Sequence, residues 1–236
     1  MATALVSGGK DSVYSAYLSD SQGWDVDELL VIVPQDIDSF LFHTPNLDLV
    51  RLQAEAWGKR VREVRVEGTG EEVESAALRT ALSPGTGPVV VGAIGSSYQW
   101  GRVSRLSFEL GRPLYAPLWG KEPGRVVREE ISAGLDIRFV QVAAEPLGPE
   151  LLGRRLGLAL LEELERIGRE RRAVHVAGEG GEYETLVVDA PFFDRRIVID
   201  ESRVTERGLA ARLSITKAHL EAKPPRGAAP GPEGQP

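Results

Sequence analysis

The chain has 236 residues and a formal net charge of −7, from 35 acidic and 28 basic residues. No apolar stretch reaches the ~18 residues of a transmembrane helix, and the N-terminus lacks the basic flank and long apolar core of a signal peptide, so we expect a cytoplasmic protein without a membrane span. The absence of cysteine excludes disulfides, thiolate metal sites and thiol nucleophiles, and the acidic balance disfavours a broad nucleic-acid footprint.

Short apolar runs alternate with amphipathic helical patterns through the first half of the chain. The predicted strands are residues 4–6, 29–33, 61–66 and 89–91, and the predicted helices are residues 11–18, 44–57, 71–82 and 98–110. Strands that alternate with helices predict right-handed crossovers and a parallel sheet covered on both faces. We therefore expect a Rossmann-like α/β fold that binds its ligand beyond the carboxyl ends of the strands.

The pattern changes around residues 113–124, which are rich in Pro, Gly and Trp. The second half is predicted to contain two helices and four strands, which form a smaller α+β unit; the helices are residues 125–133 and 156–169, and the strands are residues 137–142, 185–188, 197–199 and 213–218. We predict one domain over residues 1–120 and a second over residues 121–222. Residues 223–236 are predicted to be a disordered tail, because eight of these fourteen residues are Pro or Gly.

A glycine-rich loop with the sequence SGGKDS, residues 7–12, lies between the first strand and the first helix. Adjacent glycines bring backbone N–H groups close to an anion, and the helix N-terminus adds partial positive charge. Only five of the 28 basic residues are lysines, so Lys10 stands out in this loop. The loop predicts a phosphate or pyrophosphate site at the protein surface, although it matches neither the Walker pattern nor GxGxxG.

The SGGKDS sequence resembles the signature of the PP-loop ATP pyrophosphatases, which implies cleavage of ATP to AMP and pyrophosphate. Further segments narrow this resemblance to the diphthine–ammonia ligase family, and these segments are His43–Asn46, Gly92–Ile94, Ser97–Gln99 with Arg102, Ala116–Trp119 and the GEGGEYET stretch of residues 178–185. The resemblance runs from residue 4 to about residue 190. It implies an AMP-forming ligase that adenylates diphthine on translation elongation factor 2 and amidates it with ammonium to give diphthamide.

The resemblance and the phosphate argument together assign residues to an ATP site. The residues expected to bind ATP are Ser7, Gly8, Gly9, Lys10, Asp11, Ser12, His43, Gly92, Ile94, Tyr98, Gln99 and Arg102. Lys10 is expected to be catalytic, because its charge would offset that of the leaving pyrophosphate. Asp11 is expected to hold Mg²⁺, although an acid in the first helical turn is equally favourable without a metal. A lone histidine such as His43 is more often structural, and the resemblance favours function.

Three acids of the second unit, Glu179, Glu182 and Glu184, are also expected to be catalytic. If the chain is extended after the glycines, Glu182 and Glu184 point to one side of a strand while Tyr183 and Thr185 point to the other. Paired carboxylates can hold magnesium, bind ammonium or accept a proton as ammonia attacks. Which acid has which role stays open, and without the resemblance we would favour solvated acids at an edge strand.

Ammonia would come from free ammonium, because the cysteine on which glutaminase domains depend is absent. One departure from the family pattern is that Ser104 and Ser107 stand where relatives tend to have an acid and a cysteine, which leaves the role of that acid in doubt. Two alternatives are a PP-loop enzyme that adenylates a tRNA base, which the acidic balance disfavours, and an ATP-sensing module without turnover. A homodimer is left open.

Overall fold

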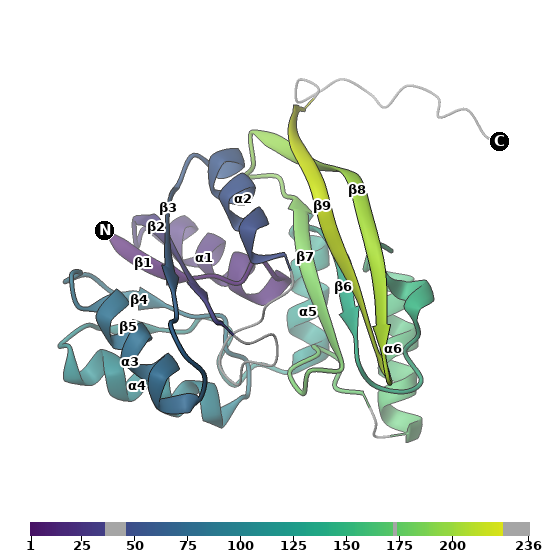
Figure 1. Ribbon diagram of the computed structural model, residues 1–236, viewed down its shortest axis with the longest axis horizontal. Helices are drawn as coiled ribbons and strands as arrows, with labels where there is room; N and C mark the ends of the chain where they lie inside the picture. Colours follow the sequence, from purple (N-terminus) through teal and green to yellow (C-terminus); the bar gives the residue numbers. More distant parts are fainter. Residues whose placement is uncertain (36–45, 172–173, 224–236) are drawn as a thin grey trace.

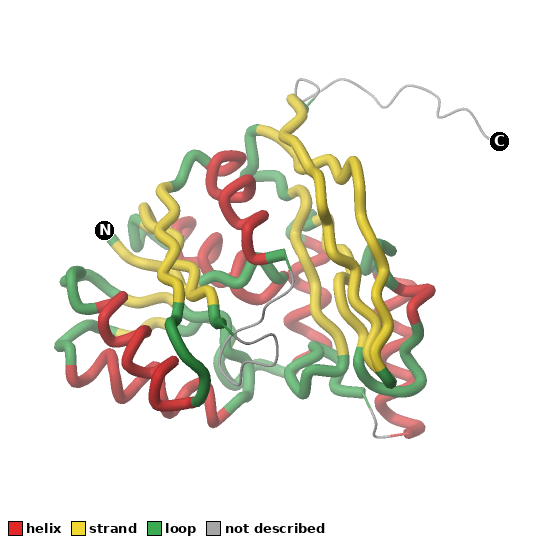
Figure 2. The backbone as a smooth tube through the Cα atoms, in the orientation of Figure 1, coloured by secondary structure: helices red, strands yellow, loops and turns green. Residues whose placement is uncertain are grey.

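The computed structural model of the chain describes residues 1–35, 46–171 and 174–223, and it contains two β-sheets (Figure 1, Figure 2). The first sheet is parallel and has the strand order β3-β2-β1-β4-β5. Its elements are β1 (Ala2–Leu5), α1 (Lys10–Ser21), β2 (Val26–Val33), the 3-10 turn η1 (Leu47–Leu49), α2 (Val50–Trp57), β3 (Arg60–Arg65), α3 (Glu71–Leu82), β4 (Val89–Val90), α4 (Ser97–Glu109) and β5 (Leu114–Tyr115). The parallel α/β fold expected from the sequence is confirmed.

Strand β2 shows why helices cover both faces of the first sheet. Its apolar residues alternate in direction, as successive side chains of a strand must. Leu29 and Val31 belong to the buried cluster that includes residues of α1 and α2, whereas Leu30 and Ile32 belong to the cluster formed with α3 and α4. A continuous apolar run is therefore what a strand buried on both faces requires.

The second sheet is antiparallel and has the strand order β7-β6-β9-β8. Its elements are α5 (Pro123–Ser132), β6 (Asp136–Val142), the 3-10 turn η2 (Pro149–Leu151), α6 (Leu158–Arg171), β7 (Tyr183–Asp189), β8 (Arg195–Arg207) and β9 (Ala210–Ala222). Helices α5 and α6 pack on one face, and Leu49 and Leu52 from the first unit pack on the other. None of the helices in the described part of the chain has the length and apolarity to cross a membrane.

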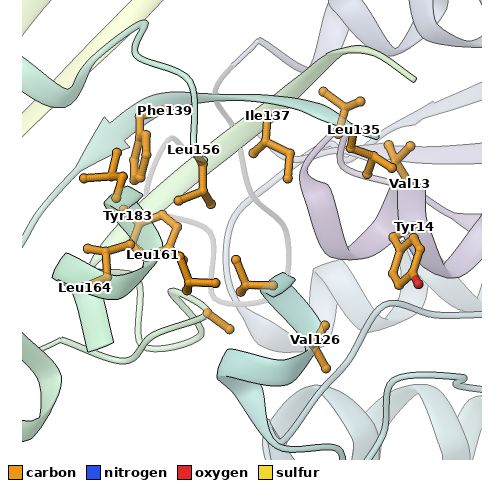
Figure 3. Close-up of a cluster of buried hydrophobic side chains, with 14 of the residues drawn as sticks. Val13, Tyr14, Val126, Leu135, Ile137, Phe139, Leu156, Leu161, Leu164 and Tyr183 are labelled. Atoms are coloured by element: carbon orange, nitrogen blue, oxygen red, sulfur yellow. The ribbon is translucent and has the colours of Figure 1, made fainter. Parts of the chain in front are cut away.

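Helix α1 links the two sheets, because different sides of it are buried in different clusters. Ala16 packs among residues of β1 and β2. Val13 and Tyr14 pack with side chains of the second unit, including Ile137 of β6, in one continuous core (Figure 3). The N-terminus of α1 and the loop before it are therefore held at the junction of the two sheets. The domain division near residue 120 stays a prediction.

The sequence prediction fell short in the last two strands and in one short strand. Strands β8 and β9 have 13 residues each and pair from Arg195↔Ala222 to Arg207↔Ala210. Residues 200–207 of β8 are exposed, so no apolar alternation marks them, whereas β9 alternates through Leu213 and Ile215 and only its ends were missed. The two-residue strand β5 was not predicted at all. The predicted start of α2 at residues 44–45 and residues 224–236 of the predicted tail lie outside the described residues.

Candidate active site

The glycine-rich loop closes into a tight turn between β1 and α1. The Ser12 hydroxyl accepts a hydrogen bond from the Ser7 N–H at 3.1 Å and donates one to the Gly9 carbonyl at 3.0 Å. Gly8 has a φ of +82°, a conformation that glycine adopts at little cost. The N–H groups of Gly9, Asp11 and Ser12 have no hydrogen-bond acceptor among the described residues, as expected at the start of a helix. They form a site suited to an anion.

A pocket with a cavity volume of about 170 Å³ opens beside this loop at the carboxyl edge of the first sheet. One part of its wall is apolar, and the residues of this part include Leu5, Leu30, Ile32, Leu78, Val91, Trp100 and Val103. Another part is polar and includes Ser7, Asp11, Ser12, Glu179, Glu184 and Thr185. An apolar wall with a few convergent polar groups is typical of a small-molecule site, and this combination suits a nucleotide base and its phosphates.

Lys10 is 1% exposed, so the surface position expected for the glycine-rich loop does not extend to its lysine side chain. Its Nζ donates to both carboxylate oxygens of Asp11 at 2.7 Å and to the Ala177 carbonyl at 2.8 Å. Burial alone would lower the pKa of this ammonium, but the Asp11 carboxylate raises the pKa above its ordinary value, so the group is charged. Residues of the second unit cover the side chain. Contact of Lys10 with phosphate stays a prediction, and it would require the ammonium to exchange acceptors.

Glu130 of α5 is a buried acid that the sequence interpretation missed. It is 0% exposed, and its carboxyl group lies beside that of Asp11, with which it forms a side-chain hydrogen bond. Burial raises the pKa of Glu130 well above its usual range, and the neighbouring Asp11 raises it further against the opposing effect of Lys10. Glu130 follows Val126 and Val127 at helical spacing on the buried face of α5, and a charged residue on that face was the available signal.

Glu179 connects the second unit to the loop before α4. Its Oε1 accepts hydrogen bonds from three consecutive N–H groups, those of Ile94 at 3.0 Å, Gly95 at 2.8 Å and Ser96 at 3.3 Å. A Cβ added to Gly95 would stand only 3.2 Å from the other carboxylate oxygen. The carboxylate therefore lies in a nest of successive backbone N–H groups just before α4 and holds one wall of the pocket.

Glu182 and Glu184 do not share one side of a strand as expected. Strand β7 begins at Tyr183, so Glu182 lies in the preceding turn. Its carboxylate accepts hydrogen bonds from the N–H groups of His175 at 2.9 Å and Gly180 at 3.0 Å, which holds that turn closed. Glu184 lines the pocket and Glu182 does not. The catalytic roles of these acids stay predictions.

Gly92 lines the pocket, as expected for a residue near the base. It also allows the loop after β4 to approach α1, because a Cβ at Gly92 would stand 2.8 Å from backbone atoms of Asp11 and Ser12. Ile94 is 2% exposed and packs in the shared core rather than on the pocket wall. It contributes to the site through its backbone N–H, which donates a hydrogen bond to the Glu179 carboxylate.

Tyr98 and Arg102 bind α3 rather than the pocket. The Tyr98 hydroxyl donates to the Glu71 carboxylate at 2.8 Å, Arg102 forms an ion pair with the same carboxylate, and the Arg102 guanidinium lies 4.3 Å from the centre of the Tyr98 ring. Neither residue lines the pocket. The side chain of Gln99 and the whole of His43 lie outside the part of the chain that the structure describes.

Trp100 is a pocket residue that the sequence interpretation did not assign. It lines the apolar wall and stacks on Trp119, with ring centres 4.5 Å apart and an angle of 18° between the planes. The stack joins α4 to the segment after β5. The sequence did mark Trp119, which belongs to the family-like Ala116–Trp119 segment. Nothing in the sequence indicates that Trp119 stacks on Trp100.

The glycine-rich loop at the α1 N-terminus and the two-sided pocket at the edge of a parallel sheet define a nucleotide-binding α/β protein of the PP-loop type. Comparison with known families gives two matches, to the diphthamide synthase N-terminal domain over residues 1–113 and to the diphthamide synthase C-terminal domain over residues 122–220. The chain belongs to the diphthine–ammonia ligase family, as its relatives show.

Three diphthine–ammonia ligases illustrate the similarity of this chain to its relatives. The Mus musculus and Homo sapiens proteins are each 32% identical to this chain, and each alignment covers 93% of this chain and 92% of the relative. The Schizosaccharomyces pombe protein is 31% identical over 93% of this chain but only 39% of its own length. Among solved structures, a Methanocaldococcus jannaschii chain described as a predicted subunit of tRNA methyltransferase superposes with a TM-score of 0.45 and 16% identity, covering 81% of this chain and 97% of that one.

The close approach at Gly92 predicts different results for two glycine substitutions. Gly92→Ala should lower the free energy of unfolding by about 1–3 kcal/mol, because the added methyl group overpacks a backbone contact, and it should weaken ATP binding by moving the α1 N-terminus. Gly101→Ala is the control, because nothing lies within 4 Å of its added Cβ, and it should stabilise α4 by about 0.5–1 kcal/mol. Urea denaturation and calorimetry would measure both; equal effects of the two substitutions would contradict this packing.

The raised pKa of Glu130 predicts a pH-dependent stability. The folded protein keeps this proton over a range in which the unfolded chain, with a pKa near 4.5, loses it. The free energy of unfolding of the wild type should therefore fall relative to Glu130→Gln as the pH rises above that value, by up to about 1.4 kcal/mol per pH unit.

The neighbouring Glu129 supplies a control of opposite sign. A hydrogen bond from Lys121 lowers the pKa of Glu129, so the wild type should lose stability relative to Glu129→Gln as the pH falls below the unfolded pKa. Denaturation curves between pH 3 and pH 8 would separate the two. A pH-independent difference between wild type and Glu130→Gln would refute a protonated Glu130.

Proposed function

We propose that this chain amidates diphthine, a modified histidine of translation elongation factor 2, with ATP and ammonium as co-substrates and AMP and pyrophosphate as products. Membership of the diphthine–ammonia ligase family makes it a carbon–nitrogen ligase and favours this chemistry over tRNA adenylation or ATP sensing. The observation that carries the proposal is that Gly9, Asp11 and Ser12, whose N–H groups have no acceptor among the described residues, line one pocket together with Glu184. The reaction would take place in the cytoplasm, where elongation factor 2 works.

Two steps would complete the reaction. A carboxylate oxygen of diphthine attacks the α-phosphorus of ATP, the bond between the α-phosphorus and the bridging oxygen breaks, and pyrophosphate leaves. Ammonia then attacks the acyl carbon, AMP leaves with the former carboxylate oxygen, and a base takes a proton from the attacking nitrogen. The N–H groups of the glycine-rich loop would stabilise the charge that grows on pyrophosphate.

Asp11 would hold Mg²⁺ in this scheme. Its carboxylate stands at the polar end of the pocket, and Mg²⁺ is commonly bound through one or two protein carboxylates together with substrate phosphates. Both Asp11 oxygens also contact the Lys10 ammonium, so the ion and the ammonium would share this carboxylate. When bound, the ion would neutralise charge on the phosphates.

The three acids of the GEGGEYET stretch would have different roles. Glu184 lines the pocket, and we assign it the handling of ammonia and its proton. Glu179 would hold the loop before α4 in place, since its carboxylate is occupied by three N–H groups. Glu182 would keep the turn before β7 closed. The second unit, residues 121–222, would thus supply the acceptor side of the site.

The proposal is tested by incubating the chain with ATP, ammonium and elongation factor 2 that carries diphthine. We expect AMP release together with the mass change of an acid converted to an amide. Neither should occur when ammonium is omitted or when the factor lacks diphthine. AMP release that depends on tRNA instead of the factor would favour the adenylating tRNA enzyme, and ATP binding without release of pyrophosphate would favour the sensor.

Glu184→Gln should slow amide formation by about 10²- to 10⁴-fold, the usual contribution of a general base, while pyrophosphate is still released and the acyl-adenylate accumulates. Glu182→Gln is the matched control, because it should lower the melting temperature through the weakened turn and leave the rate of the folded enzyme closer to that of the wild type. Single-turnover quenching and thermal melts would measure these effects. If Glu182→Gln slowed amide formation more than Glu184→Gln did, the role assigned to Glu184 would be excluded.

A further inference from the structure

Gln53 of α2 contacts the glycine-rich loop from the side away from solvent. Its side chain is 1% exposed. Its Nε2 donates to the Gly8 carbonyl at 2.9 Å and to the Val187 carbonyl of β7 at 2.7 Å, and the Val187 N–H donates to the same Gly8 carbonyl at 3.0 Å. Three hydrogen bonds therefore join α2, the loop and the second sheet at one point.

These bonds fix the direction of the next N–H group. In a trans peptide the carbonyl of Gly8 and the N–H of Gly9 point to opposite sides of the chain, and the single cis peptide among the described residues is at Glu145-Pro146. Since the Gly8 carbonyl is held toward Gln53 and β7, the Gly9 N–H must point away from them. Gly9 lines the pocket, and its N–H has no acceptor among the described residues.

The chemistry of the site requires an amide side chain. The NH₂ group of glutamine offers two hydrogens, and here they serve two carbonyl oxygens, while its Oε1 has no partner among the described residues. Glutamate at this place would set carboxylate oxygens against carbonyl oxygens, and methionine has the same length but no donor. The close fit also depends on Gly8, because an added Cβ would stand 3.2 Å from the Gln53 Oε1.

We infer that Gln53 is a positioning residue, which holds the Gly8–Gly9 peptide so that the Gly9 N–H is aimed at the diphosphate of the bound nucleotide. The inference rests on the proposed function, since it takes ATP as the ligand. Because Gln53 also binds β7 two residues beyond Thr185, it ties the orientation of the phosphate-binding loop to the strand that carries Glu184.

Gln53→Met tests this role by comparing two nucleotides. The variant keeps the length of the side chain and removes both donors. ATP affinity should fall by about ten-fold or more, since a hydrogen bond to a charged acceptor is no longer well directed. AMP affinity should change by less than about two-fold, because AMP lacks the groups that Gly9 would contact. Calorimetry gives both dissociation constants, and a melting temperature shows whether the variant is folded.

Glu55→Gln is the control for a general effect of changing the contact between α2 and the second sheet. Glu55 lies in the same helix and pairs with Arg195 of β8 at 2.8 Å, and both side chains are exposed. Its removal should leave both affinities unchanged. Equal losses of ATP and AMP affinity in Gln53→Met, or no loss of either, would overturn the inference. A wild type that does not bind ATP would instead count against the proposed function.

A measurement on the wild type covers the case in which Gln53→Met does not fold. When pyrophosphate is added to ¹⁵N-labelled protein, the amide resonance of Gly9 should shift, and that of Gly101 in α4 should not. Shifts at Asp11 and Ser12 without one at Gly9 would show that the Gly9 N–H points elsewhere, and the inference would be wrong. No shift anywhere in the loop would remove both the inference and the phosphate site on which it depends.

Discussion

The hydrogen bond from the Val187 N–H to the Gly8 carbonyl joins the glycine-rich loop to the second sheet, and the pocket depends on this contact. Strand β7 can pass so near only because the loop has no side chains there; a Cβ at Gly9 would stand 3.2 Å from the Thr185 carbonyl. The Lys10 N–H donates to the Thr185 hydroxyl at 3.2 Å and strengthens the same contact. The paired glycines thus allow a close approach of two backbones.

The charge distribution follows from this arrangement. The Lys10 ammonium is buried by the second unit and paired with Asp11, so the positive character of the loop comes mainly from its backbone N–H groups and the N-terminus of α1. The carboxylates of Glu179 and Glu184 also border the pocket. Glu179 accepts hydrogen bonds from three N–H groups, and these bonds stabilise its carboxylate in this position.

Local sequence predicted the first sheet well, because its strands and helices carry strong apolar periodicity. The predicted helix over residues 71–82 has the same bounds as α3, Glu71–Leu82. Residues 200–207 of β8 have no buried face and leave no apolar pattern to detect. This part of β8 is held by its backbone pairing with β9.

The pocket lies beside the loop from which the sequence predicted the candidate site, whereas several details of its surroundings were not predictable. The loop motif and Glu184 were found from the sequence, whereas the burial of Lys10 depends on Ala177 and Tyr183, which are distant in the chain. Gln53 carries no motif, and nothing near it in sequence indicates a partner in β7. Glu182 was misplaced because β7 begins only at Tyr183, so the alternation of strand side chains does not extend to Glu182 in the preceding turn.

The polar end of the pocket is shared between the two halves that the family matches divide, residues 1–113 and residues 122–220. The first half supplies the loop and the apolar wall, and the second supplies the strand on which the loop rests. Neither half alone supplies all the residues that line the pocket, so the candidate site exists only when both halves are packed together. A change that moved the second half away from the glycine-rich loop would therefore open the pocket, even if every residue of the first half kept its place.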